Sequence, residues 1–353
     1  MERSGKQLKS LFCGVRPAIM PYMNTADCLY PFVLEPAYKD YIWGGNRIPS
    51  RFHRDLPDGI YAESWELSDR PEGMSTVANG ALKGQSLADL VTRFGAALIG
   101  SGTQSPHFPL LVKLIDARER LSIQVHPDDP AASRGIGEAK TEAWHILDAP
   151  AGAQVFAGLK PGIDKPAFLA ALKAGRLENS LQAVPVTAGD TIFIPGGRVH
   201  AICEGLLILE VQQNSNTTYR VYDWGRTDKA GKPRELHVEQ ALNVVLWNDT
   251  APVKTAPKSL RDKPGAEVTE LVSSPYFRLE RLGLSAPFFV HHDGGSFHAL
   301  FSGDAEIAVL SGVGSVTVPR GRTCLIPAAL DRYTIRPSDR HADVLRISVP
   351  SHT

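Results

Sequence analysis

Short runs in which apolar and polar residues alternate, separated by turn residues, recur along most of the chain. Alternation with a period of two is typical of a half-buried β-strand, and glycine or proline bounds most of these runs. The pattern therefore predicts a mainly β architecture. The clearest predicted strands are TIFIP at 191–195, LLILEVQQ at 206–213, TYRVYDW at 218–224 and AEIAVLSG at 305–312.

Two segments follow a helical period instead. In 86–100, Ser86 is the predicted N-cap, Asp89 completes a capping box three residues later, and apolar residues then recur every three or four positions. In 164–175, an aspartate precedes the first turn and a glycine ends the last one. Because so many predicted strands surround them, we expect both segments to be small helical insertions.

A weak internal repeat relates two parts of the chain. GDTIFIP at 189–195 and GRTCLIP at 321–327 each consist of a glycine, five residues and a proline that ends an apolar strand. The first copy continues to His200 and the second, at the same spacing, to Arg332. The repeat predicts two related β-barrels, of which the first has a metal site and the second, which lacks the histidine, has none.

The chain of 353 residues is long enough for one large domain or for two or three ordinary ones. A polar stretch at 249–265, rich in lysine and proline, is typical of a linker. We therefore expect a disordered N-terminal extension at 1–29, a metal-binding domain with helical inserts at 30–248 and a second domain without a metal at 266–353.

Charge and composition narrow the possible classes of protein. Lysine plus arginine and aspartate plus glutamate each total 38, so the formal net charge is zero. Without a global basic field we expect no nucleic-acid or membrane partner, and no apolar run is long enough to span a bilayer. The four cysteines are widely spaced, as is typical of reduced thiols, and the basic N-terminal stretch lacks a secretory apolar region. We therefore expect a cytoplasmic protein.

A polar pair in the segment LSIQVH at 121–126 is the first sign of chemistry. Side chains alternate along a strand, so Gln124 and His126 share one face while three apolar residues take the other. Glu142 in KTEAW and His200 in PGGRVHAI lie in two further strand-like segments. Because the inward side chains of neighbouring barrel strands meet in one cavity, these four residues are predicted to converge on one divalent ion.

Such a set of ligands is suited to Lewis-acid chemistry. Glutamine and histidine are neutral and glutamate supplies one negative charge, so a divalent ion would keep a net positive charge with which to polarise a carbonyl or hydroxyl. The set contains no thiolate, which argues against a structural, cysteine-rich site. The alternative is that the four are separate polar residues, each satisfied locally, but their joint pattern favours a metal. His145, three positions after Glu142, falls on the opposite strand face and is excluded.

Other charged and polar residues sit in apolar surroundings close to these segments. Glu210 and Arg220 are either a structural ion pair or a base and a cationic anchor, and the sequence does not decide between them. Lys113 interrupts an apolar run, either as an edge-strand lysine or as a phosphate contact. Lys140 shares the strand face of the candidate glutamate ligand, and Ser122 shares the face of the polar pair.

With these segments in place, the chain resembles the type I mannose-6-phosphate isomerases (phosphomannose isomerases), in particular their short bacterial subgroup. The motifs that carry the resemblance are IWGG (42–45), ESWELSD (63–69), LVKLIDA (111–117), LSIQVHPDD (121–129), KTEAW (140–144), PGGRVHAI (195–202), QQNSNTTYRVYDWGR (212–226) and KPRELHVEQAL (232–242). The resemblance implies a double-cupin fold and a catalytic arginine at Arg220. It also implies one zinc ion per chain, with ligands Gln124, His126, Glu142 and His200.

The resemblance further implies a reaction. It is the interconversion of mannose 6-phosphate and fructose 6-phosphate through an enediol(ate), with a sugar phosphate as the small-molecule partner of a monomer or homodimer. Glu210 is then a candidate base, Lys140 a candidate aid to proton transfer, and Lys113 and Ser122 are candidates for substrate contact. One departure is Arg198 beside the last ligand, an extra cation that would either affect phosphate binding or point outward.

Two rival functions fit the same predicted fold. The first is a metal-dependent oxygenase, which usually prefers iron sites rich in histidine, so the glutamine and glutamate ligands argue mildly against it. The second is a cupin protein that binds a sugar phosphate without converting it. A pure binding protein has no need of all four ligands together with Arg220, which argues against this alternative.

Overall fold

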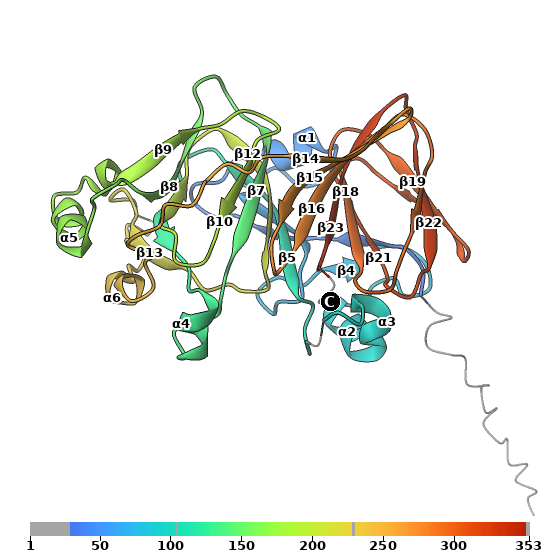
Figure 1. The fold of residues 1–353 in the computed structure, drawn as a ribbon, viewed down its shortest axis with the longest axis horizontal. Helices are drawn as coiled ribbons and strands as arrows, with labels where there is room; N and C mark the ends of the chain where they lie inside the picture. Colours follow the sequence, from blue (N-terminus) through green and yellow to red (C-terminus); the bar gives the residue numbers. More distant parts are fainter. Residues whose placement is uncertain (1–28, 104, 228–229, 351–353) are drawn as a thin grey trace, which may run out of the picture.

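The alternating segments form strands that pair into four antiparallel sheets, arranged as two β-sandwiches (Figure 1). The computed structural model describes residues 29–103, 105–227 and 230–350. The expectation of an extension at 1–29 therefore lies outside the described residues, except for Leu29, which is buried. The mainly β prediction is confirmed. No helix within the described ranges is long and apolar enough to cross a membrane.

The first sandwich consists of a six-stranded and a five-stranded sheet. The larger has the order β10-β7-β12-β5-β3-β2 and the smaller the order β13-β6-β11-β8-β9. The strands of the larger sheet are β2 (Ala37–Lys39), β3 (Glu63–Leu67), β5 (Leu110–Ala117), β7 (Glu142–Asp148), β10 (Thr191–Ile194) and β12 (Leu206–Gln213). Those of the smaller sheet are β6 (Ile123–Val125), β8 (Gln154–Leu159), β9 (Leu181–Pro185), β11 (His200–Ile202) and β13 (Tyr219–Tyr222).

The second sandwich pairs an eight-stranded with a four-stranded sheet. Their orders are β14-β15-β16-β23-β18-β21-β1-β4 and β17-β22-β19-β20. The strands of the larger sheet are β1 (Phe32–Glu35), β4 (Thr76–Val77), β14 (Lys258–Lys263), β15 (Ala266–Ser273), β16 (Arg278–Leu284), β18 (His298–Ser302), β21 (Thr323–Ile326) and β23 (Ala342–Ser348). Those of the smaller sheet are β17 (Phe288–His291), β19 (Ile307–Ser311), β20 (Gly314–Val318) and β22 (Arg332–Pro337).

The helices are short and lie between or beside these strands. They are α1 (Arg47–Arg51), α2 (Leu87–Phe94), α3 (Ala96–Ile99), α4 (Asp129–Ser133), α5 (Lys165–Lys173), α6 (Val238–Leu242) and the 3-10 helix η2 (Leu177–Ser180). Both predicted N-caps are confirmed: Ser86 closes a capping box with Asp89, and Asp164 accepts a backbone N–H in the first turn of α5. The first predicted helix is interrupted at Gly95, whose φ of 48° no regular helix can contain.

The six-stranded sheet is covered on both faces, which decides where its polar residues point. On β5, Val112 and Leu114 pack between the two sandwiches, whereas Lys113 and Ile115 face the interior of the first. On β12, Glu210 lies opposite Lys113 in the antiparallel ladder and shares that inward face. The pair of Lys113 and Glu210 therefore lies on the inward face of a sheet whose opposite face packs against the second sandwich.

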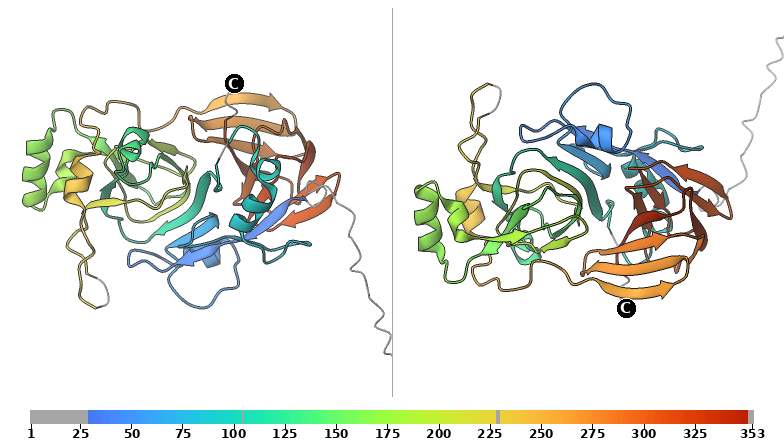
Figure 2. Two further views of the ribbon diagram at one scale, coloured as in Figure 1. Left: turned by 90° about the horizontal axis from the view of Figure 1, so that it is seen from below. Right: turned by 90° about the horizontal axis from the view of Figure 1, so that it is seen from above.

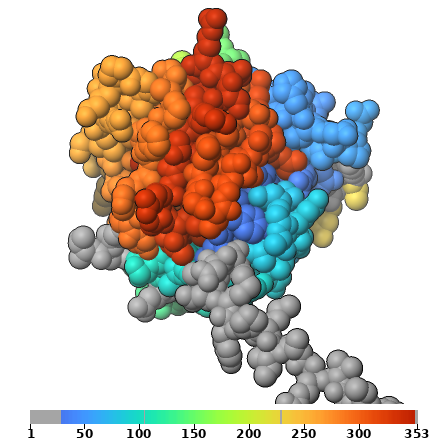
Figure 3. Space-filling view, turned by 90° about the vertical axis from the view of Figure 1, so that its right-hand side faces the viewer, coloured from blue at the N-terminus to red at the C-terminus, as the bar shows by residue number. Residues whose placement is uncertain are grey.

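The two sandwiches lie side by side (Figure 2), and the blue segment that carries β1 joins the second one (Figures 2 and 3). Strand β1 pairs with β21, so a segment from the expected first domain extends a sheet of the second sandwich. The stretch 249–265, which was interpreted as a linker, contains strand β14. The side chains of β14 are exposed, as in a linker, but its backbone pairs with β15. The division into two domains at this stretch stays our proposal, with β1 and β4 attached to the second sandwich.

The predicted repeat corresponds to β10–β11 in the first sandwich and β21–β22 in the second. The strands of the two copies differ in register by one residue, so the last residues of the two copies face opposite sides of their strands. His200 is fully buried, whereas Arg332 has a side chain 77% exposed, and the next residue, Tyr333, is the one that points into the second core. A shift of one residue along a strand moves a side chain to the other face, so Arg332 does not occupy the histidine's place.

Candidate active site

The turn between β10 and β11 brings His200 beside the segment that carries Gln124 and His126. Gly197 donates its N–H to the carbonyl oxygen of His126 at 2.7 Å and has a φ of 87°, which favours glycine. A Cβ atom on Gly196 would stand 2.6 Å from a carbonyl oxygen of the neighbouring loop, so a larger residue would push the two segments apart. Strand β11 then pairs with β6, with His200 opposite Gln124.

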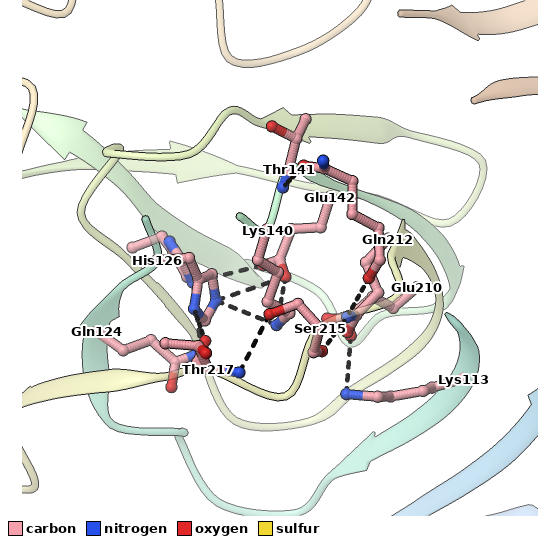
Figure 4. A network of polar contacts seen from close by, with 12 residues as sticks. Lys113, Gln124, His126, Lys140, Thr141, Glu142, Glu210, Gln212, Ser215 and Thr217 are labelled. Atoms are coloured by element: carbon pink, nitrogen blue, oxygen red, sulfur yellow. Dashed lines mark hydrogen bonds and ion pairs between the residues drawn. The ribbon is translucent and has the colours of Figure 1, made fainter. Parts of the chain in front are cut away.

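Three buried side chains form the centre of the site. His126 follows β6, Glu142 begins β7 and His200 begins β11, and none of the three is more than 1% exposed. The Nε2 atom of His126 lies 3.5 Å from Oε2 of Glu142, and Nε2 of His200 lies 3.4 Å from Oε1. The candidate ligand atoms all lie within 4.8 Å of one another, and Figure 4 shows His126 and Glu142 pointing toward one another.

Both imidazoles turn Nε2 toward the centre and Nδ1 toward the backbone. Nδ1 of His126 lies 2.9 Å from the carbonyl oxygen of Thr217, and Nδ1 of His200 lies 2.8 Å from that of Arg198. Because a carbonyl oxygen can only accept, each Nδ1 carries the proton and the lone pair of each Nε2 points toward the centre. Burial lowers the pKa of His200 to about 3 and that of His126 well below its ordinary value, so both rings are neutral at pH 7.

The surroundings of Glu142 favour a cation beside its carboxylate. Neither of its oxygens accepts a hydrogen bond of acceptable geometry from the residues described, and burial raises its pKa to about 7. The ammonium Nζ of Lys140 lies 2.7 Å from Oε2 of Glu142 and 3.1 Å from Nε2 of His126. A buried carboxylate is costly unless it is paired or coordinates a metal, so the surroundings of Glu142 suit a positive ion.

Gln124 is close enough to provide a fourth donor. Its Nε2 lies 3.3 Å from Nε2 of His200, and its Oε1 accepts a hydrogen bond from the hydroxyl of Ser122 at 3.3 Å. Rotation of the amide by half a turn would bring the oxygen to the position of the nitrogen. Two imidazole nitrogens, one carboxylate and one amide oxygen, with no thiolate, make a donor set that fits a divalent metal ion.

A pocket of about 290 Å³ lies beside this centre. It contains the remaining residues that the sequence singled out. They are Lys113, Ser122, Lys140, Glu210 and Arg220. Figure 4 shows several of these side chains converging from different strands. The structure therefore brings together in one region every residue predicted for the site.

Inside the pocket, Glu210 is paired with a lysine. Nζ of Lys113 lies 3.3 Å from Oε1 of Glu210 and 3.8 Å from Oε2 of Glu63, while the indole of Trp144 donates to Oε2 of Glu210 at 3.2 Å. Burial opposes ionisation of Glu210, but the charges of Lys113 and Lys140 lower its pKa. Burial would also favour neutral Lys113, but the two carboxylates raise its pKa. Both groups are therefore charged.

Arg220 does not form the structural pair with Glu210 that the sequence left open. Strand β13 places Arg220 opposite Gln124 of β6, and its guanidinium donates to the carbonyl oxygen of Glu235 at 2.9 Å. Its buried Nε atom has no hydrogen-bond partner among the residues described. The guanidinium thus lines the pocket with donor capacity to spare.

Arg198, the departure noted in the sequence, has a structural place. It is almost fully buried, and its guanidinium forms an ion pair with Asp249, with Nη2 2.9 Å from Oδ1. It also donates to the carbonyl oxygens of Phe193 and Ala251. Arg198 is therefore not a candidate for phosphate contact.

Sequence reasoning missed several residues of the pocket wall. They are Tyr41, Glu63, Arg234 and His237, none of which was predicted as a site residue. For Glu63 the sequence did contain a signal. A carboxylate two positions before a tryptophan in a strand lies on the same face as the indole. In the structure the indole N–H of Trp65 donates to Glu63 at 2.7 Å.

Comparison with known proteins identifies the family. Residues 32–145 match the family described as phosphomannose isomerase type I, catalytic domain. A mannose-6-phosphate isomerase from Streptococcus mutans is 36% identical over 318 residues, which cover 88% of this chain and 90% of the relative. A mannose-6-phosphate isomerase from Bacillus subtilis is 38% identical over 217 residues, 61% of this chain and 68% of the relative.

Comparison with solved structures leads to the same family. The crystal structure of a mannose 6-phosphate isomerase from Bacillus subtilis superposes with a TM-score of 0.83 at 31% identity, and the match covers 91% of this chain and 99% of that one. A putative mannosephosphate isomerase from Archaeoglobus fulgidus, 24% identical with a TM-score of 0.71 over 90% of this chain and 96% of that one, shows the same fold. This chain belongs to the family of type I phosphomannose isomerases.

Proposed function

We propose that this chain interconverts mannose 6-phosphate and fructose 6-phosphate through an enediol(ate). One observation carries the proposal: the buried centre of His126, Glu142 and His200 opens onto a pocket with an ionised glutamate and an arginine, in a chain whose relatives are named for this reaction. A sugar phosphate is the partner that this function needs. The chain would work as a monomer or homodimer in the cytoplasm.

The metal we propose is one zinc ion per chain, with Gln124, His126, Glu142 and His200 as ligands. Neutral imidazoles and carboxyl or amide oxygens are ligands that zinc accepts. When bound, the ion would supply positive charge that stabilises the oxygen charge developing on the substrate. The hydrogen bonds from each histidine Nδ1 to a backbone carbonyl hold the rings in the orientation this role needs.

Glu210 is our candidate for the base. Its carboxylate is ionised and lines the pocket, so it could take the proton from C2 of the open-chain aldose and return it to C1. The proton lost from C2 is balanced by the one returned to C1, and the hydroxyl proton lost from O2 is balanced by the one gained at O1, so the step needs no external oxidant or reductant. A positioned base typically contributes roughly 10²–10⁴-fold to the rate. Lys140, whose ammonium faces the centre, would assist ring opening and proton transfer.

Arg220 is our candidate for stabilising the enediolate, because its guanidinium lines the pocket with an unpartnered Nε. A donor fixed in advance toward a developing oxyanion lowers the barrier, since it does not have to reorganise during the reaction. The ammonium of Lys113 and the hydroxyl of Ser122 line the same pocket and are our candidates for contacts to the substrate.

The test is to incubate the purified chain with zinc and mannose 6-phosphate in D2O and to follow the products by NMR. We expect fructose 6-phosphate that carries some deuterium at C1, because a base that lines an open pocket exchanges the abstracted proton with solvent in a fraction of the turnovers. Sugar phosphate that binds but is never converted would indicate a binding protein instead. Oxygen consumption without isomerised product would indicate an oxygenase.

A further inference from the structure

The pocket has two ends, and the pairing of strands β6 and β13 shows which residues lie at each end. His126, Gln124 and Ser122 share the inward face of the β6 segment, so Ser122 lies about 13 Å along the strand from His126 at about 3.3 Å per residue. Strand β13 runs antiparallel beside it, with Arg220 opposite Gln124. Asp223, which follows β13, therefore lies toward the Ser122 end, away from the metal centre.

Positive charge gathers at this second end. Asp223 accepts hydrogen bonds from two arginines: from Nε of Arg234 at 2.7 Å and Nη2 at 2.5 Å, and from Nη2 of Arg226 at 2.5 Å. Arg220 is the third arginine of the group. Arg234 and Arg226 bind the buried carboxylate of Asp223, and the other acidic groups nearby, Glu119 at 3.9 Å from Arg226 and Glu235, have side chains 49% and 83% exposed to solvent. The group therefore carries an excess of positive charge.

Only one of the two arginines that donate hydrogen bonds to Asp223 faces the pocket. Arg234 lines it, whereas Arg226 does not and instead donates to the carbonyl oxygen of Arg120 on the far side. Two of the three guanidinium nitrogens of Arg234 point to Asp223, which leaves Nη1 for a ligand. Asp223 thus holds the guanidinium in a fixed orientation at the pocket wall.

A second arginine, Arg220, lines the same pocket, and its Nε has no hydrogen-bond partner among the described residues. Two like charges that crowd each other beside a pocket are stabilised by an anion between or beside them. A doubly charged phosphate group is suited to that place, and an uncharged hexose is not.

We propose that Arg234, in the segment between β13 and α6, binds the phosphate group of the substrate and sets the preference for phosphorylated over free sugar. The inference rests on the proposed function. In a hexose 6-phosphate, C1 and C2 react at one end of the carbon chain and the phosphate is attached at the other. Reacting carbons at the metal centre therefore place the phosphate toward Ser122 and Arg234.

The experiment compares Arg234→Met with the matched control Arg226→Met, both as zinc-loaded full chains. Each variant removes one partner of Asp223, but only the first removes a charge from the pocket wall. For Arg234→Met we expect the KM for mannose 6-phosphate to rise about 10- to 100-fold with kcat changed less than about threefold, as loss of a charge-assisted bond predicts. Arg226→Met should change either value less than about threefold.

Two further readouts separate binding from structure. Calorimetry with inorganic phosphate should show a similar loss of affinity in Arg234→Met, and Arg234→Lys should recover part of it because it restores the charge without the planar fork. The ratio of kcat/KM for mannose 6-phosphate to kcat/KM for free mannose should fall about 10- to 100-fold in Arg234→Met, so the preference for the phosphorylated sugar falls. Zinc content and melting temperature are measured for every variant.

Equal effects of the two methionine variants, or phosphate affinity within about twofold of the parent in Arg234→Met, would overturn the assignment. A parent protein that binds phosphate through Arg234 but converts no mannose 6-phosphate would leave this subsite standing and refute the proposed reaction instead. The two failures are therefore distinguishable.

Discussion

At the scale of single residues, Glu142 is the group on which the centre depends. It contacts both histidines and a lysine, yet neither of its oxygens has a well-formed hydrogen bond from the described residues. Neutral imidazoles supply lone pairs but no charge. The carboxylate would therefore give a divalent ion its electrostatic stabilisation, and the histidines would fix the position of that ion.

We predict that His126→Ala loses both the metal and the isomerase activity, because one of three buried donors is removed. The matched control is His145→Ala, which removes another buried histidine, on β7, that hydrogen-bonds with the hydroxyl of Thr191 at 3.0 Å outside the centre. The control should keep its metal. Elemental analysis of both variants decides the question, and a metal-loaded, active His126→Ala protein would remove this histidine from the centre.

For Arg220, we predict that Arg220→Lys keeps its metal and melts within a few degrees of the parent but turns over about 10²–10³ times more slowly. The lysine keeps the charge but lacks the planar fork that fixes the geometry. Little stability should be lost, since Arg220 is not paired with Glu210 and donates mainly to a backbone carbonyl. Near-normal turnover in a stable Arg220→Ala protein would exclude the residue from the mechanism.

Residue patterns predicted which side chains meet, but not all of their partners. The alternation in LSIQVH correctly directed Gln124 and His126 inward. It was wrong for Leu121, which lines the pocket because strand β6 begins only at Ile123. Arg234 could not be found, since its place depends on how a long connection after β13 folds back onto Asp223.

At the scale of elements, strands β5 and β12 are long and apolar on both faces, yet they carry Lys113 and Glu210 opposite each other. A charged pair inside a sheet is stable only while both partners are present. The sequence showed two charges interrupting two apolar runs, but their pairing depends on the register between strands about a hundred residues apart. For this reason the lysine partner of Glu210 was not predicted.

We predict that Lys113→Met lowers the free energy of unfolding by roughly 3–5 kcal/mol, because it leaves two buried carboxylates without their cation. Glu210→Gln should cost less, since Lys113 keeps Glu63 at 3.8 Å. Chemical denaturation of both single variants and of the double variant provides the measurement. A Lys113→Met protein as stable as its parent would show that this pair is hydrated rather than buried.

At the scale of the whole molecule, the six-stranded sheet holds the centre on one face and packs against the second sandwich with the other. The repeat and the strand patterns predicted two β units. They could not predict that β1 would join a sheet almost 300 residues away, because short strands give no sign of their partners. The assembled molecule buries His145 near the contact between the sandwiches.

We predict that this burial makes stability depend on pH. Burial, and next the charge of Arg281, lowers the pKa of His145 to about 4. Below its ordinary pKa of about 6.5 the unfolded chain takes up a proton that the folded chain refuses, so stability falls as the pH drops toward 4. Relative to His145→Asn, the parent should lose up to about 1.4 kcal/mol per pH unit between pH 6 and 4.5. Parallel stability curves for the two proteins would contradict this.

The central claim is that one divalent ion, held by His126, Glu142 and His200, is required for isomerisation. The most direct measurement is to strip the purified chain with a chelator, add zinc back in known amounts and record bound zinc and turnover of mannose 6-phosphate together. We predict that activity is lost on stripping and rises in proportion to bound zinc up to one ion per chain. Full turnover by a stripped chain with less than about a tenth of an equivalent of any divalent metal would contradict the claim.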